Sequence, residues 1–186
     1  MSENKAENVI ETATLGGGCF WCIEAALKQL EGVKSTVSGY AGGRIANPRY
    51  EAVCGGDTGH AEVVRLEFDP TTIDYHTLLL AFFTAHDPTT QNRQGNDVGE
   101  QYRSVIFTHS ALQAKVAQEL IAELDAQHAW PAPIVTQVLP ATQFWPAEAY
   151  HQDYFANNQR QPYCAVVVAP KVAKLRKSFS DRIKKC

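Results

Sequence analysis

The sequence predicts an α+β fold: a two-layer sandwich in which helices pack on one side of a mixed sheet, with a ferredoxin-like core and long loops around the site. The order strand–helix–strand occurs twice, with apolar residues at alternating or helical spacing. The chain has 186 residues, 45% of them hydrophobic, and contains neither a repeat nor a low-complexity linker. We therefore expect a single domain over residues 11–186, after a flexible N-terminus of residues 1–10.

The two strand–helix–strand units supply most of the expected sheet. Their strands are expected at residues 11–15, 33–40, 61–68 and 104–108. The first helix begins after Cys19, and apolar positions such as Ile23, Leu27 and Leu30 recur along it at helical spacing. The second helix is amphipathic and covers residues 73–84.

After the second unit, helix and strand continue to alternate as far as the C-terminus. A helix rich in alanine and leucine is expected over 111–126, and Pro131-Ala132-Pro133 then breaks the chain. The remaining elements are expected to be a strand at 134–139, a polar helix at 146–157, a strand at 164–169 and a helix within 171–185. In the last helix, basic residues alternate with Val172, Leu175 and Ile183, which favours a docked amphipathic helix over a binding arm.

The composition excludes several classes of protein. A formal net charge of −3 gives no reason to expect a nucleic-acid or membrane partner. No apolar run approaches the roughly 20 residues of a membrane-spanning helix, and the polar N-terminus lacks the core of a secretory signal. We therefore expect a cytoplasmic protein, and a monomer. In that reducing compartment, the five cysteines indicate transient, catalytic disulfides rather than structural ones.

The run Gly16-Gly17-Gly18-Cys19-Phe20-Trp21-Cys22 is the most informative segment of the chain. Its glycines allow a sharp turn from the first strand into the first helix. Cys19 then falls at a helix N-terminus, where free N–H groups and the dipole favour a thiolate. Phe20 and Trp21 are placed to line an apolar pocket beside that sulfur. The alternative is a buried structural cysteine in a tight turn, but the second thiol and the aromatics favour a reactive site.

The spacing Cys19-x-x-Cys22 resembles a redox pair and also half of a zinc site. Zinc needs a second cysteine or histidine pair at short spacing. Because Cys54, Cys164 and Cys186 each stand alone, we expect no bound metal.

Two long connections, 41–60 and 85–103, hold polar and aromatic side chains that a simple connector would not need. Tyr50 and Tyr102 offer phenolic donors for a polar oxygen, although single tyrosines are more often half-buried core residues. Asp97 can orient a tyrosine, or it can simply cap a turn.

Glu62 begins a strand directly after the first of these loops and shares one face with Val64 and Leu66. An apolar environment there would raise the pKa of the carboxyl and keep it protonated as a general acid. The alternative is a strand-end carboxylate that faces solvent. A nucleophilic thiol and a neutral acid suit attack on a polarised sulfur–oxygen group. They also suit a thiol hydrolase, which would need a histidine base. The histidine candidates, none with a local signature, are His60, His86 and His151.

Six motifs follow one another in an order typical of one family. They are Gly18-Cys19-Phe20-Trp21, Tyr40-Ala41-Gly42-Gly43, Asn47-Pro48-Arg49-Tyr50, Gly59-His60-Ala61-Glu62, Asp97-Val98-Gly99-Glu100-Gln101-Tyr102-Arg103-Ser104 and Ala149-Tyr150-His151-Gln152-Asp153-Tyr154. On these motifs, which span residues 14–163, the chain resembles the peptide methionine sulfoxide reductase A family. The resemblance implies repair of oxidised proteins under oxidative stress, acting on the S epimer of methionine sulfoxide, free or in proteins.

The resemblance also implies a role for each matched residue. Cys19 matches the nucleophile and Glu62 the proton donor, so that protonation of the sulfoxide oxygen accompanies thiolate attack on the sulfur. Methionine leaves, and a sulfenic acid remains on Cys19. The residues that match the methyl-binding pocket and the lining of the site are Phe20, Trp21 and Tyr154. The residues that match groups holding the sulfoxide oxygen, or ordering those groups, are Tyr50, Tyr102 and Asp97.

The resemblance further implies that a second thiol forms a disulfide with Cys19, which thioredoxin reduces without a bound cofactor. Tyr163-Cys164 matches one resolving position of the family to within a residue, so Cys164 is the first choice. The alternatives are Cys22, where many members carry glycine, and Cys186 at the C-terminus. Cys54 is expected to be an ordinary buried thiol.

Two other classes of function remain open. A thioredoxin-like thiol–disulfide oxidoreductase would use Cys19 and Cys22, although such folds usually place a proline opposite the pair and do not need Glu62. A non-catalytic peptide-binding module would use Phe20 and Trp21 as anchors, but it leaves the thiols unexplained.

Overall fold

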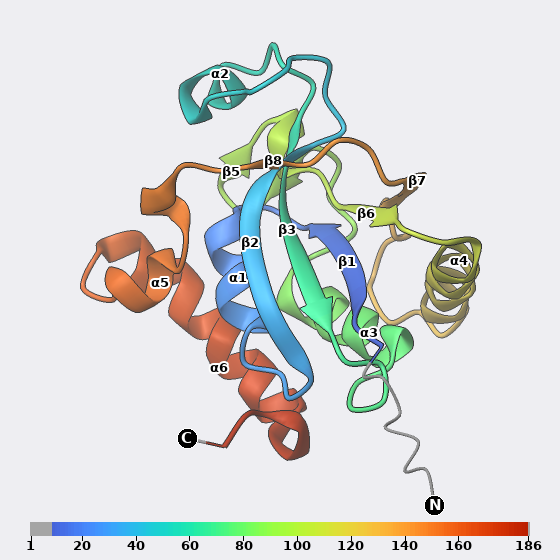
Figure 1. The fold of residues 1–186 in the computed structure, drawn as a ribbon. Helices are drawn as coiled ribbons and strands as arrows, with labels where there is room; N and C mark the ends of the chain where they lie inside the picture. The colour runs from blue at the N-terminus through green and yellow to red at the C-terminus, as the bar shows by residue number, and fades with distance from the viewer. Residues whose placement is uncertain (1–8, 186) are drawn as a thin grey trace, which may run out of the picture.

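The computed structural model describes residues 9–185 and has a six-stranded mixed sheet with helices α1, α3 and α6 gathered behind it (Figure 1). The strands of this sheet are β1 (Glu11–Gly16), β2 (Val33–Ala41), β3 (Ala61–Phe68), β6 (Val105–Thr108), β7 (Gln137–Pro140) and β8 (Trp145–Pro146). The α-helices are α1 (Phe20–Leu27), α2 (Tyr50–Cys54), α3 (Tyr75–Ala85), α4 (Ala111–Ala126), α5 (Tyr154–Asn157) and α6 (Ala169–Ser178). The short strands β4 (Arg93–Gln94) and β5 (Asp97–Val98) form a separate hairpin.

The strand order β7-β6-β1-β3-β2-β8 confirms the ferredoxin-like core. The inner four strands, β6-β1-β3-β2, are antiparallel neighbours, α1 connects β1 to β2, and α3 connects β3 to β6. The sheet is mixed because β7 pairs with β6 in parallel. No helix within residues 9–185 is long and apolar enough to cross a membrane.

Strand β3 is buried on both faces, and its alternation decides which residues meet the helices. Val64 and Leu66 pack with α1 and α3 in the main core. Val63 points to the other face, where a smaller cluster includes Phe107 and Phe144. Glu62 therefore lies on the helical side of the sheet, as the alternation predicts.

The strand expected at 164–169 is wrong, because this segment is helical. Residues Cys164–Val168 form a π-helical stretch that continues directly into α6. The run of valines favours a strand by local propensity, but Cys164, Val168 and Val172 are buried at a spacing of four residues. That spacing buries one face of a helix against α1 and α3, so tertiary packing overrides the β-branched side chains.

The polar helix expected at 146–157 is also wrong as one continuous element. Pro146 ends β8, a 3₁₀ helix covers Ala149–His151, and only Tyr154–Asn157 is α-helical. Asp153 has a left-handed backbone, with φ of 51°, which separates the two turns. The C-terminal helix ends at Ser178, earlier than expected, and the two long loops contain α2 and the β4–β5 hairpin.

The turn between β1 and α1 is tightly packed. Gly18 has φ of 88°, and a Cβ there would lie 2.6 Å from Cγ of Gln94. The Gln94 side chain cannot easily move away, because it hydrogen-bonds both the N–H and the carbonyl of Asp87. At Gly16, a Cβ would lie 2.8 Å from the carbonyl oxygen of Glu62. These glycines therefore let α1 begin directly beside β3.

Gly18→Ala is expected to lower the free energy of unfolding by more than Gly95→Ala. Both glycines have positive φ, which costs a residue with a Cβ about 1–2 kcal/mol. Only Gly18 adds a steric clash, since a Cβ on Gly95 meets nothing within 4 Å. Urea unfolding of both variants and the parent chain measures the difference. Equal losses would contradict the packing described for this turn.

Candidate active site

Cys19 occupies the N-cap position of α1, at the turn that follows β1. Its side chain is 8% exposed and makes no capping hydrogen bond to the helix. The Phe20 N–H instead donates to Oε2 of Glu62, at 3.0 Å. A carboxyl group from β3 therefore caps α1 beside the thiol, in the place where helix N-termini favour an oxygen acceptor.

Glu62 is 1% exposed, and this burial raises the pKa of its carboxyl to about 8. The bond from the Phe20 N–H lowers that pKa, while the charges of Asp97 and Cys22 raise it. The side chain is thus mainly protonated at neutral pH. The raised pKa expected from the strand alternation is confirmed.

The surroundings of Cys19 oppose the thiolate that its position at a helix N-terminus would favour. Burial raises the pKa of Cys19, and the neighbouring Cys22 thiol and the Glu62 charge raise it further. At Cys22, hydrogen bonding with Cys19, the positive charge of Lys171 and a contact with Tyr163 lower the pKa, and together they outweigh burial and the negative charge of Asp97, which raise it. The surroundings thus favour the neutral thiol at Cys19 and the thiolate at Cys22.

Aromatic side chains enclose the space next to the cysteines. The Trp21 ring stacks on Tyr154, with centroids 3.6 Å apart and planes inclined by 5°. The Trp21 indole N–H donates to Nδ1 of His151, at 3.0 Å. Phe20 packs against the rings of His151 and Tyr40, at 5.1 and 5.7 Å. The structure thus brings together Phe20, Trp21 and Tyr154, as the sequence predicts.

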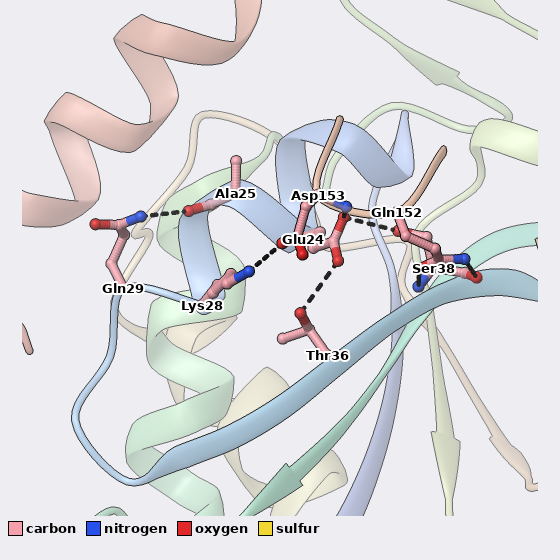
Figure 2. Close-up of polar contacts among 8 residues, drawn as sticks. All are labelled: Glu24, Ala25, Lys28, Gln29, Thr36, Ser38, Gln152 and Asp153. Atoms are coloured by element: carbon pink, nitrogen blue, oxygen red, sulfur yellow. Dashed lines mark hydrogen bonds and ion pairs between the residues drawn. The ribbon is translucent and has the colours of Figure 1, made fainter. Parts of the chain in front are cut away.

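A buried polar network holds the segment that carries Tyr154, as Figure 2 shows. The carboxylate of Glu24, on α1, accepts hydrogen bonds from Thr36, Ser38 and the backbone N–H of Asp153, at 3.1, 3.2 and 3.1 Å. Lys28 forms an ion pair with the Asp153 side chain. Glu24 is thus tied to both β2 and the residue that precedes α5.

Gln152 completes this attachment. Its side chain accepts from the Ser38 N–H and donates to the carbonyls of Ser38 and Ala147, at 2.9, 2.9 and 3.1 Å. Through the Gln152 side chain, the segment before Tyr154 is therefore hydrogen-bonded to the backbone of β2. Since α1 also carries Trp21, one set of contacts fixes both rings of the stack.

Tyr50 and Tyr102 lie near the acid, on the two long loops. Tyr50 is the first residue of α2, its N–H donates to Glu148, and its ring lies 4.4 Å from that of His151. Tyr102 ends the 3₁₀ helix after β5. Burial raises the pKa of both phenols, and the Glu62 charge adds to the effect in each case. Both hydroxyl groups therefore stay protonated as donors.

Asp97 orients a tyrosine that sequence reasoning missed. Its carboxylate accepts from the hydroxyl of Tyr163, at 2.7 Å, and that hydroxyl lies 3.9 Å from Sγ of Cys22. The pair Tyr163-Cys164 is the sequence signal for this tyrosine, since it matches the family motif next to the cysteine.

The sequence indicates His151 only as a candidate base of a hydrolase, and not as part of the aromatic pocket. It is fully buried, and burial lowers the pKa of its ring. Its Nε2 has no hydrogen-bond partner among the described residues and lies 4.0 Å from Glu148. With Nδ1 occupied by Trp21, the ring supports the aromatic pocket.

Among the remaining cysteines, Cys54 differs from the expected burial. Cys54 is exposed at the end of α2, so the expected buried thiol is wrong. Cys164 is buried, and burial together with the charge of Cys22 raises its pKa. The four described cysteines are all free, and Cys186 lies outside the described residues. Within residues 9–185, no group of three or more potential ligands converges on a metal position.

The chain is similar to known proteins along most of its length. The sequence model of the family described as "Peptide methionine sulfoxide reductase" matches residues 11–183. The "Peptide methionine sulfoxide reductase MsrA" of Polynucleobacter asymbioticus is 57% identical over 185 residues, which cover 98% of this chain and 97% of that protein.

Solved structures of yeast Mxr1 are similar in fold. Mxr1 from Saccharomyces cerevisiae in reduced form is 36% identical, with a TM-score of 0.77 over 83% of this chain and 89% of that one. Mxr1 in complex with Trx2 gives 25% identity and a TM-score of 0.56 over the same shares of the two chains. The chain therefore belongs to the peptide methionine sulfoxide reductase A family, and it is an oxidoreductase that reduces methionine sulfoxide.

Proposed function

We propose that this enzyme reduces the S epimer of methionine sulfoxide, free or in proteins, with Cys19 as nucleophile and Glu62 as general acid. The observation that carries the proposal is the buried carboxyl of Glu62, held by the Phe20 N–H at the helix end that bears Cys19. The Cys19 thiol is the more exposed of the pair, since Cys22 is fully buried. Substrate sulfur can therefore approach Cys19 first.

Glu62 and Cys19 supply the protons that the reduction of the sulfoxide needs. The Glu62 carboxyl gives its proton to the sulfoxide oxygen while Sγ of Cys19 attacks the substrate sulfur. The carboxylate then takes the thiol proton of Cys19, which the raised pKa has kept in place until attack. In the resulting adduct the hydroxyl passes from the substrate sulfur to Sγ of Cys19: the substrate sulfur–oxygen bond and the new sulfur–sulfur bond break, a sulfur–oxygen bond forms on Cys19, methionine leaves, and Cys19 carries the sulfenic acid.

Substrate recognition is proposed to divide between apolar and polar groups. The methyl group of the sulfoxide packs in the pocket formed by Phe20, Trp21 and Tyr154. The hydroxyls of Tyr50 and Tyr102, which stay protonated, donate to the sulfoxide oxygen. Asp97 contributes indirectly, because its carboxylate accepts from the Tyr163 hydroxyl and so holds the Tyr163 side chain in place.

For the second thiol, three candidates came from the sequence: Cys164, Cys22 and Cys186. The geometry favours Cys22, because it lies one turn of α1 from Cys19, with its N–H donating to the Cys19 carbonyl at 3.0 Å, and because its surroundings lower its pKa. Phe20 and Trp21 do not obstruct it, since their rings contact Tyr40, Tyr154 and His151 in the aromatic pocket. Cys164 sits within a packed helical segment and would have to move to reach Cys19.

Thioredoxin is the proposed reductant of the resulting disulfide. The yeast relative Mxr1 forms a complex with Trx2, and the resemblance extends over 83% of this chain. We further propose that residues 11–186 act as one catalytic domain in a monomeric, cytoplasmic enzyme without a bound cofactor. The net charge of −3 supports protein and small-molecule substrates rather than nucleic acid.

Cys19→Ser is expected to abolish methionine formation even in a single turnover, because the hydroxyl is a far weaker nucleophile than a thiol. Cys22→Ser, Cys54→Ser and Cys164→Ser are the matched controls, and each should still yield about one equivalent of methionine. Mass spectrometry of a methionine sulfoxide peptide, with enzyme in excess, measures the yield. A folded control variant that gives no methionine would contradict the role of Cys19 as the sole essential thiol.

Glu62→Gln is expected to keep more activity than Glu62→Ala, because glutamine still donates a hydrogen bond and still accepts from Phe20. General acid catalysis typically contributes about 10²–10⁴-fold. In the parent enzyme, single-turnover rates should fall as pH rises above about 8, where Glu62 loses its proton. The glutamine variant should lack this decline. Parent-like rates in Glu62→Ala would place the acid elsewhere.

The ionisation of Glu62 should also change the stability of the protein with pH in the absence of substrate. The folded pKa of about 8 exceeds the ordinary 4.5, so the folded protein retains a proton that the unfolded chain has released. Between these values, stability of the parent should fall with rising pH by up to about 1.4 kcal/mol per unit relative to Glu62→Gln. Glu67→Gln, at an exposed position of β3, is the matched control and should leave the pH dependence unchanged. Parallel curves for the parent and Glu62→Gln would contradict a protonated buried carboxyl.

Trp21→Ala is expected to raise KM or slow the chemical step for methionine sulfoxide peptides. Losing one methyl contact costs only about 0.8 kcal/mol, whereas misplacing the sulfur can cost on the order of 10²-fold. Trp130→Ala removes a ring of equal size that packs on Phe83, away from the site, and serves as control. Steady-state kinetics distinguishes the two variants. Unchanged kinetics in Trp21→Ala would remove this ring from the pocket.

A further inference from the structure

We propose that Tyr163 and Asp97 form a proton relay that activates Cys22 as the thiol resolving the Cys19 sulfenic acid. This inference rests on the proposed function and assigns a role to two groups that sulfoxide reduction leaves partly unused. Neither the hydroxyl of Tyr163 nor its contact with Cys22 has a part in binding the sulfoxide methyl group or in the general acid step.

The direction of the hydrogen bonds carries the argument. A phenol has one hydrogen, and the short 2.7 Å contact with an acceptor-only carboxylate requires Tyr163 to donate that hydrogen to Asp97. The Tyr163 oxygen is then an acceptor toward Cys22, whose Sγ lies 3.9 Å away. Cys22, Tyr163 and Asp97 therefore form a chain along which a proton can leave the thiol.

The surroundings give the thiol few other routes for its proton. Cys22 is 0% exposed, so direct transfer to bulk water is blocked in this conformation. The Tyr163 ring is held edge-on against Trp21, with centroids 5.8 Å apart, which limits rotation away from the sulfur. Asp97 belongs to the β4–β5 hairpin, so the relay joins that loop to α1.

The relay serves the formation of the disulfide between Cys22 and Cys19. The Cys22 thiol gives its proton to Tyr163 as the phenolic proton passes to Asp97, and Sγ of Cys22 attacks the sulfur of the Cys19 sulfenic acid. The sulfur–sulfur bond forms, the sulfur–oxygen bond breaks, and the oxygen leaves as water with a proton from Glu62. Both sulfurs end in the disulfide, and no external oxidant is needed. Asp97 and Glu62 then re-equilibrate their protons with solvent.

Tyr163→Phe tests the relay, since it removes only the hydroxyl. Enzyme mixed with one equivalent of a methionine sulfoxide peptide is quenched over time, and methionine, dimedone-trapped sulfenic acid and disulfide are each quantified by mass. The variant should slow disulfide formation at least about tenfold more than methionine formation, so that sulfenic acid accumulates. Tyr75→Phe, which removes a buried hydroxyl without a partner among the described residues, is the matched control and should not change the ratio.

Two further readouts separate activation of Cys22 from a merely structural effect. The pH dependence of the disulfide step should shift to higher pH in Tyr163→Phe, because the thiolate loses its phenolic partner. Asp97→Asn keeps a hydrogen-bond acceptor for the phenol but cannot take its proton, so it should slow the disulfide step about as much as Asp97→Ala, whereas a merely structural role would let the asparagine variant keep the parent rate.

The outcomes are distinguishable. Equal slowing of both steps in Tyr163→Phe, or an unchanged ratio, overturns the relay. A disulfide that maps to Cys19–Cys164, Cys19–Cys54 or Cys19–Cys186 overturns it as well, while methionine formation leaves the proposed reductase chemistry intact. Failure of the parent enzyme to form methionine, by contrast, contradicts the proposed function itself.

Discussion

The hydrogen bond from the Phe20 N–H to the Glu62 carboxyl connects the fold of this enzyme to its chemistry. It caps α1, whose N-cap residue Cys19 makes no capping bond of its own, and it draws strand β3 against the helix end. The same contact places an acid next to the thiol and encloses it among apolar neighbours. Burial then keeps this carboxyl protonated, so one interaction supports both the helix start and the proton donor.

Close packing around this bond explains the glycine run. Gly16 and Gly18 have no room for a Cβ, because the backbone of Glu62 and the side chain of Gln94 occupy the space. The Gln94 contact also fixes the hairpin that carries Asp97, and through it Tyr163. The β4–β5 hairpin and the helical segment that follows Tyr163 are thus positioned relative to the turn between β1 and α1.

A second constraint acts on the opposite side of the pocket. Glu24 and Gln152 attach the irregular segment before α5 to α1 and β2, so that Tyr154 stacks on Trp21 (Figure 2). The buried carboxyl of Glu24 has three hydrogen-bond donors, which offset part of the cost of its removal from water, while burial still raises its pKa. The aromatic pocket is consequently built from parts of the chain more than 100 residues apart, yet it is held by specific polar contacts.

The sequence by itself determined the βαββαβ core and the position of Cys19 at a helix start, because alternation and helical spacing report these directly. Alternation also placed Glu62 on the same face as Val64 and Leu66, but only the structure decided that this strand-end carboxyl is buried. Six motifs also identified the family. Only the tertiary structure decided the helical state of 164–168, where packing on α1 and α3 overrides the propensity of valine, and the break at Asp153, where long-range hydrogen bonds replace a helix. It also decided the surroundings of the two thiols. Burial and the Glu62 charge raise the pKa of Cys19, while hydrogen bonding with Cys19, the Lys171 charge and Tyr163 lower that of Cys22; of these groups Glu62, Lys171 and Tyr163 are remote in the sequence.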